Sequence, residues 1–166
     1  MSQTQHLSAD TTTIRQARDD DAAAVIALVA AAYADYPGCI LDVETETPEL
    51  LAPASSHAAM GGDFWVAEAA GQVVGSVGYQ PLHGGVELLK LYVAREARGQ
   101  GLGRRLIALV EEAARAAGAS HIELWTDMRF TAAHRLYEHL GFLRSLDTRR
   151  LDDLSRSVEY HYRLEL

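Results

Sequence analysis

One stretch near the middle of the chain limits the fold more than any other: an apolar run that leads through a glycine-rich loop into a helix. Residues 88–93 have the apolar, β-rich composition of a strand. Gly99, Gly101 and Gly103 follow, and behind them an apolar stripe at helical spacing ends near Gly118. The stretch therefore predicts a strand, a tight loop and a helix in direct succession.

The charges around this loop indicate that it binds an anion. Glycines leave backbone N–H groups open, and a helix N-terminus adds unpaired donors and the positive end of a dipole. First turns of helices normally favour Asp or Glu, yet this one carries Arg104 and Arg105, with Arg98 shortly before it. In a chain with a formal net charge of -8, this local concentration of arginine predicts a negatively charged ligand.

The spacing of the glycines separates this loop from two common phosphate-binding motifs. The third glycine of a dinucleotide fingerprint would fall on Arg104, and the Gly-Lys-Ser/Thr of a P-loop is missing. The loop instead fits R/Q-x-x-G-x-G/A, and so resembles the pyrophosphate loop of the GNAT superfamily, the acyl-CoA-dependent N-acyltransferases. The resemblance implies that the pyrophosphate of acetyl-CoA is held by Arg98, Gly99, Gln100, Gly101, Gly103 and Arg104.

A second motif, residues 130–142, is similar to the family pattern N-x-x-A-x-x-L-Y-E-x-x-G-F. Six of its positions fall in place: Ala133, Leu136, Tyr137, Glu138, Gly141 and Phe142. Phe130 stands where the family often has an Asn that hydrogen-bonds the cofactor arm. The resemblance implies that Phe130 and Ala133 lie along the cofactor, with this one contact in question.

The remaining patterns agree with the fold that the resemblance implies. Alternating apolar runs predict strands near 11–17, 64–68, 73–79, 86–93, 120–126, 142–146 and 158–164, and helical spacing predicts helices near 20–34, 102–117 and 131–140. Thr47-Pro48-Glu49 predicts the start of a further helix that Pro53 would soon interrupt. We expect an α/β (α+β) GNAT fold, with a mixed, largely antiparallel sheet of six to seven strands flanked by about four helices. Residues 12–166 are expected to form one domain behind a flexible leader, residues 1–11.

The resemblance also assigns catalytic roles. It implies that Tyr137 is the general acid that protonates the departing CoA thiolate, which a phenol with a pKa near 10 can do at neutral pH; from the residues alone, a tyrosine on the inner stripe of a helix is more often core than catalyst. Glu87 lies eleven residues before Arg98, a spacing similar to that of the carboxylate base in the histone-acetylating branch. Asp127 and a chain of water molecules remain alternatives for the base.

The cofactor arm is expected to run beside the fourth strand. In the family, the strand before the glycine loop and the next one splay apart, and the pantetheine pairs with backbone like an added strand. This nominates Leu91, Tyr92 and Val93, and an N–H near Val93 would polarise the thioester carbonyl. The predicted function is transfer of an acetyl group from acetyl-CoA to a primary amine of a small molecule or peptide by direct attack. A non-catalytic acyl-CoA sensor and a transferase for longer acyl groups are the alternatives.

The acceptor and the partners are less constrained. Residues 35–62 are irregular and acidic but carry no sharp motif, so peptide N-termini, lysines, polyamines, amino acids and aminoglycosides all remain open. The acidic balance argues against nucleic acid, no apolar run reaches the length of a membrane span, and a single cysteine, Cys39, favours the cytoplasm. His134 and His139 do not share a helix face, so no metal site is expected. The alternating final strand leaves a homodimer open.

Overall fold

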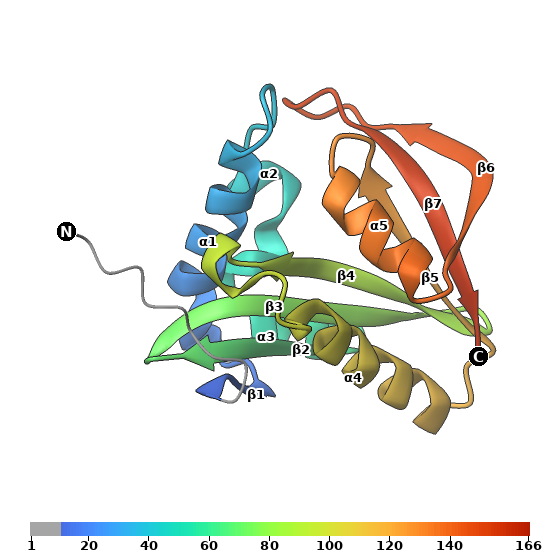
Figure 1. Cartoon of the computed structure of the whole chain (residues 1–166), viewed down its shortest axis with the longest axis horizontal. Coiled ribbons are helices and arrows are strands. Elements are labelled where there is room, and N and C mark those ends of the chain that lie inside the picture. Colours follow the sequence, from blue (N-terminus) through green and yellow to red (C-terminus); the bar gives the residue numbers. More distant parts are fainter. Residues whose placement is uncertain (1–10) are drawn as a thin grey trace.

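A computed structural model describes residues 11–166 and contains one seven-stranded sheet in the order β1-β2-β3-β4-β5-β7-β6 (Figure 1). The strands are β1 (Thr13–Gln16), β2 (Asp63–Ala69), β3 (Gln72–Leu82), β4 (Gly85–Val93), β5 (His121–Asp127), β6 (Leu143–Arg150) and β7 (Val158–Glu165). The predicted fold class and order of elements are confirmed. The expected leader falls outside the described residues except for Thr11.

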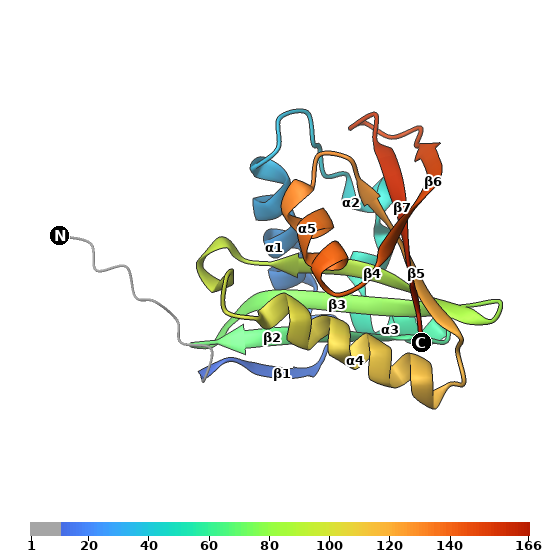
Figure 2. The same ribbon diagram turned by 45° about the vertical axis from the view of Figure 1, so that its right-hand side comes forward.

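Five α-helices accompany the sheet in the described part of the chain: α1 (Ala22–Ala34), α2 (Val43–Glu46), α3 (Pro53–Ala59), α4 (Leu102–Ala116) and α5 (Thr131–His139). Helices α1 to α3 lie on one face, and α4 lies on the other (Figures 1 and 2). No helix of the described residues is long and apolar enough to cross a bilayer.

The sheet divides into two parts at the junction of β4 and β5. All other neighbours are antiparallel, whereas β4 and β5 run parallel and pair at only two positions, Val86 with Ile122 and Glu87 with Glu123. Beyond Glu87 the two strands separate, and α5 lies in the space between them (Figure 2). We call this space the wedge; it gives β4 a free backbone edge toward β5.

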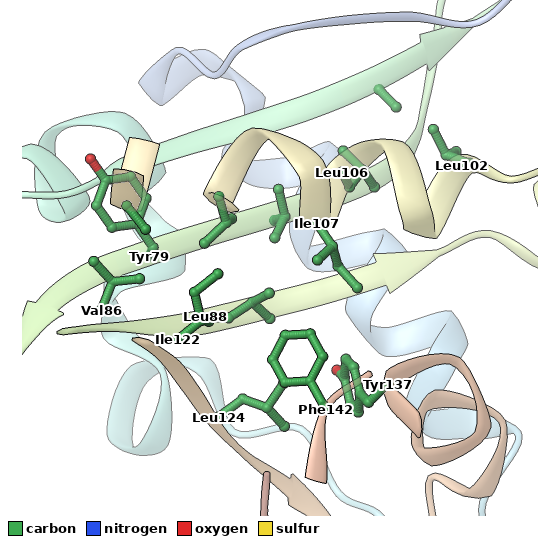
Figure 3. Close-up of a cluster of buried hydrophobic side chains, with 14 of the residues drawn as sticks. Tyr79, Val86, Leu88, Leu102, Leu106, Ile107, Ile122, Leu124, Tyr137 and Phe142 are labelled. Carbon is green, nitrogen blue, oxygen red and sulfur yellow. The ribbon is translucent and has the colours of Figure 1, made fainter. Parts of the chain in front are cut away.

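A continuous core holds the two parts of the sheet together. Alternation along β4 directs Val86 and Leu88 into a cluster with Leu106 and Ile107 of α4 and with residues of β5 and α5 (Figure 3). Leu106 and Ile107 are fully buried. A second, smaller cluster under α1 packs against Phe64 and Val66 of β2. The amphipathic stripe that the sequence predicts for α4 is therefore the surface that joins the helix to the sheet.

One local expectation holds in part. A helix begins at the predicted position behind Thr47, but it is a short 3-10 helix, Pro48–Leu51, that ends before Pro53; Pro53 then begins α3, where its missing N–H costs nothing. The expectation of a final strand open to a partner is wrong, because β7 lies between β5 and β6. A partner strand could therefore not add to β7; within the described residues, the outermost strands of the sheet are β1 and β6.

Candidate active site

The glycine loop presents unpaired backbone donors ahead of α4. A short 3-10 turn, Arg95–Ala97, ends the strand, and Gly99 and Gly101 then take positive φ angles of 74° and 79°. Among the described residues, no backbone hydrogen bond outside the helices and strands uses the N–H of Gly99, Gln100 or Gly101. The first amides of α4 also lack a preceding helical carbonyl. We call this row of donors, residues 99–103, the glycine cradle, and its geometry suits an anion.

Gly103 has a different reason to be glycine. Its φ is not positive, but a Cβ placed on it would lie 2.8 Å from Cδ2 of Leu136 on α5. A Cβ on Gly99 or Gly101 would meet nothing within 4 Å. The first two glycines therefore serve the backbone conformation, whereas Gly103 allows α4 and α5 to approach each other.

A cavity of about 370 Å³ runs from the glycine cradle into the wedge. Its lining includes every residue predicted to contact the cofactor except Gln100: Leu91, Tyr92, Val93, Arg98, Gly99, Gly101, Gly103, Arg104, Phe130 and Ala133. The side chain of Gln100 instead donates to the carbonyl of Glu96 (3.4 Å). Segments that are distant in the sequence thus form one elongated site.

Strand β4 carries an irregularity beside this cavity. Tyr92 pairs with Ser76 and Leu89 with Gly78, so β4 has one residue more than β3 in this interval, and Lys90 takes a φ of +52°. Ser76 donates its hydroxyl to the carbonyl of Lys90 (2.8 Å), and Lys90 pairs with Glu49 (3.0 Å). A bulge of this kind bends a strand and redirects its backbone groups, here just before the residues that line the cavity.

The side chain of Arg98 connects the loop with α1. Its Nε donates to the carbonyl of Val93 (3.0 Å), and its Nη1 lies 3.6 Å from Asp35, which also pairs with Arg95. Arg98 is therefore near the predicted anion site, but in this structure its guanidinium is directed toward protein acceptors.

Tyr137 lies on the inner side of α5, next to Phe142 (Figure 3). Its ring is 5.7 Å from the rings of both Phe142 and Tyr162, and 4% of the residue is exposed. Burial, with a smaller effect of the Tyr162 phenol, raises the pKa of Tyr137 well above its ordinary value. The phenol therefore stays protonated at neutral pH. Leu136 lines the cavity, whereas Tyr137 is behind it and is not one of the lining residues.

Glu87 lies at the closed end of the wedge. Its Oε2 accepts from Gln80 (2.7 Å), and no described residue donates to Oε1. The neighbouring Glu123 on β5, which sequence reasoning missed, lies 3.4 Å from His121 and 3.8 Å from His161. Alternation along β5, whose even positions 122 and 124 enter the core, could have placed Glu123 on the open face.

Asp127, the alternative base, is committed to a structural pair. Its two oxygens accept from the backbone N–H (2.8 Å), Nε (2.9 Å) and Nη2 (2.7 Å) of Arg129. Burial raises the pKa of Asp127, but the Arg129 hydrogen bonds outweigh it and the net shift is downward. A buried carboxylate held in this way is a weak proton acceptor.

Phe130, in place of the family's Asn, belongs to an aromatic cluster at the open end of the wedge. Its ring lies 4.9 Å from Tyr36 and 5.9 Å from Tyr33, and Tyr33 lies 6.3 Å from Tyr92. Tyr33 lies in the last turn of α1 and Tyr36 lies just after the helix. Neither tyrosine was assigned to the site from the sequence. Among the described residues, no three His, Cys, Asp or Glu side chains are placed to hold a metal ion.

Comparison with known proteins gives a consistent assignment for most of the chain. Residues 22–142 match the model of the acetyltransferase (GNAT) family. N-acetyltransferase 8 from Rattus norvegicus is 35% identical over 91 residues, which cover 51% of this chain and 41% of that protein. N-acetylaspartate synthetase from Danio rerio is 39% identical over 119 residues, covering 64% and 42%. The chain thus spans less than half the length of these relatives.

Solved structures share the fold over nearly the whole chain. An acetyltransferase of the GNAT family from Staphylococcus aureus Mu50 superposes with a TM-score of 0.81 at 20% identity, over 93% of this chain and 99% of that one. The structure of yncA from Salmonella typhimurium with its cofactor acetyl-CoA gives 0.73 at 24%, over 94% of each. Ribosomal-protein-alanine N-acetyltransferase from Brucella melitensis gives 0.71 at 26%, over 93% and 99%.

Proposed function

Because the chain belongs to the acetyltransferase (GNAT) family, we propose that it transfers an acetyl group from acetyl-CoA to a primary amine of a small molecule or peptide by direct attack. The observation that carries the proposal is the continuous cavity between the glycine cradle and the wedge. A pyrophosphate suits the free amides at one end, and an extended, largely apolar arm suits the cavity beside the free edge of β4.

The proposed chemistry is a single displacement. The amine, once it has lost a proton, attacks the thioester carbon; the new C–N bond forms as the C–S bond breaks. Glu87, with one oxygen unoccupied by described residues, or a water molecule, takes the proton from the amine. Tyr137, which the family motif assigns as the acid, donates its proton to the departing thiolate, and the phenol is available in its protonated form at neutral pH.

The names of two similar proteins support an amine on a small molecule or at a chain end. One makes N-acetylaspartate and the other acts on the alanine of a ribosomal protein. Both acceptors carry an α-amine, although the two proteins differ from this chain in most residues. We propose this class of acceptor without choosing among its members.

The test is to incubate the protein with acetyl-CoA and a panel of amino acids, short peptides, polyamines and aminoglycosides, and to follow release of the CoA thiol. Amine-dependent release identifies a transferase and its acceptor class. Binding of acetyl-CoA without release for any amine would favour the acyl-CoA sensor. Turnover only with longer acyl-CoA donors would favour a transferase for longer acyl groups. If no acyl-CoA binds at all, both the transferase and the sensor are contradicted.

A further inference from the structure

Lys90 has a backbone conformation that is unusual inside a strand. Its φ of +52° lies in the left-handed region, which a residue with a Cβ enters only at a cost. The other two non-glycine residues with positive φ in the described part of the chain, Ala70 and Arg156, lie in connections between strands. Lys90 instead lies in β4, directly before residues 91–93, which line the cavity. A conformation of this kind persists only where the surrounding structure imposes it.

Two contacts from different elements hold Lys90 in this conformation. On β3, the hydroxyl of Ser76 donates to the carbonyl of Lys90 (2.8 Å), and Ser76 is fully buried. On the 3-10 helix Pro48–Leu51, the carboxylate of Glu49 lies 3.0 Å from Nζ of Lys90. Both partners are themselves fixed, because Ser76 lies in the middle of β3 and Leu50, next to Glu49, is completely buried in the core under α1. We call Ser76, Glu49 and Lys90 the bulge clamp.

The clamp lies at the point that sets the direction of the cofactor-side backbone of β4. Between the two residue pairs that flank the bulge, β3 has one residue, Val77, whereas β4 has two, Lys90 and Leu91. A bulge re-aims the backbone that follows it, so the conformation of Lys90 determines how residues 91–93 run beside the cavity. None of the three clamp residues lines the cavity itself. Their influence on a bound cofactor is therefore exerted through the backbone of β4.

We propose, resting on the proposed function, that the bulge clamp is a positioning device for acetyl transfer: Ser76 and Glu49 hold Lys90 at positive φ, and this aims the backbone of residues 91–93 at the thioester. Ser76 and Glu49 are thus positioning residues and not catalytic ones. Small displacements of groups that stabilise a transition state lower kcat strongly. Affinity for acetyl-CoA depends less on the clamp, because the glycine cradle and the rest of the cavity remain in place.

The first test separates the backbone conformation of Lys90 from its charge. Lys90→Ala and Lys90→Gly both remove the ammonium group that pairs with Glu49, but only glycine adopts a φ of +52° without cost. We expect kcat to fall about tenfold in Lys90→Ala and less than about twofold in Lys90→Gly, with acetyl-CoA affinity changed less than about twofold in both. Steady-state kinetics and calorimetric titration measure these quantities. Equal kcat values in the two variants would overturn the proposal.

The second test removes the other contact. Ser76→Ala should lower kcat about tenfold, and the double variant Ser76→Ala with Lys90→Gly should recover most of this loss, because glycine does not need the clamp. Ser120→Ala is the control: its hydroxyl makes the same kind of bond, to the carbonyl of Gly84 (2.9 Å), just before β4 begins. An equal fall in Ser120→Ala would overturn the proposal, as would a double variant whose losses simply add.

A third measurement does not depend on activity. Lys90 is the only lysine in the sequence, so labelling the protein with isotopically enriched lysine gives one backbone amide signal in nuclear magnetic resonance, and this signal reports on the bulge. We expect one sharp signal in the wild type and in Ser120→Ala, and a broadened or divided signal in Ser76→Ala. An unchanged signal in Ser76→Ala would overturn the clamp. If no amine is acetylated but the signals behave as expected, the proposed function fails and the clamp is supported.

Discussion

The glycine cradle is built in the opposite way to the hydrogen-bonded group of Arg129, Ser155 and Ile40, which we call the arch. The cradle consists of consecutive residues. Among the described residues, no backbone hydrogen bond outside the helices and strands uses the N–H of Gly99, Gln100 or Gly101. The arch consists of backbone and side-chain groups from three segments, and its donors are already bonded to protein. The cradle therefore has donors available to a ligand, whereas the polar groups of the arch are bonded within the protein.

Tyr137, which belongs to neither region, gives the largest expected effect. Tyr137→Phe keeps the packing with Phe142 and Tyr162 but removes the proposed acid, so we expect kcat to fall about a hundredfold with little change in acetyl-CoA affinity. Steady-state kinetics and calorimetric titration measure the two quantities. Tyr162→Phe is the control, since its hydroxyl bonds Glu138 rather than a ligand. An equal fall in both variants would indicate a packing role for Tyr137.

The next largest effect is expected in the stability of the protein, at Asp127, which accepts hydrogen bonds from Arg129 of the arch. Asp127→Asn leaves Arg129 partly unpaired, and we expect the free energy of unfolding to fall by about 2 kcal/mol because a buried ion pair is broken. The folded-state pKa of Asp127 is lowered, so its contribution is present above the ordinary carboxyl value near 4 and is lost as pH falls through the folded-state value.

The difference in the free energy of unfolding between wild type and Asp127→Asn should therefore be largest at neutral pH and should decrease as the pH falls below about 4. Denaturant unfolding across this pH range measures it. Asp147→Asn, at an exposed position on β6, should change stability by no more than about 0.5 kcal/mol. A difference that does not depend on pH would contradict the assigned ion pair.

We expect substitutions in the glycine cradle to lower acetyl-CoA affinity through the backbone conformation and not through the volume of the added side chain. Gly101→Val forces a β-branched residue into a φ of +79°, although a Cβ there has open space. We expect acetyl-CoA affinity to fall about tenfold, since the non-glycine cost of this conformation is roughly 1–2 kcal/mol. Gly118→Val, at the other end of α4 with a φ of +73° and equally open surroundings, should lower stability without changing affinity. Equal loss of affinity in both would place the anion elsewhere.

The smallest effect is expected at Phe130, where a polar side chain would add one contact to a cofactor site that is formed mainly by backbone groups. Phe130→Asn restores the amide common in the family, and one added hydrogen bond would tighten acetyl-CoA binding about fivefold. Phe130→Leu removes the ring without adding an amide and serves as the control. If Asn and Leu behave alike, Phe130 is not beside the cofactor arm.

The different construction of the two regions explains what could be predicted from the sequence. The cradle and the α5 motif are local sequence patterns. They were therefore enough to predict the strand, the loop and the helix, together with the residues that line the cavity. The arch depends on Ser155 reaching Ile40 across 115 positions, which no local pattern indicates. Glu87 was singled out by spacing, but its position beside Glu123 follows from the parallel pairing of β4 and β5. The central position of β7 was likewise hidden, because alternation does not distinguish an edge strand from an inner one.

The brief pairing of β4 and β5 has a mechanical consequence. Four strands lie on one side of this seam and three on the other, and the seam itself is held by two residue pairs and the side chains above it. A ligand bound along both strands would add contacts across this seam and so stabilise it. Heat should then separate the two halves of the sheet less readily in the occupied protein, and the gain in melting temperature should grow with the logarithm of ligand concentration.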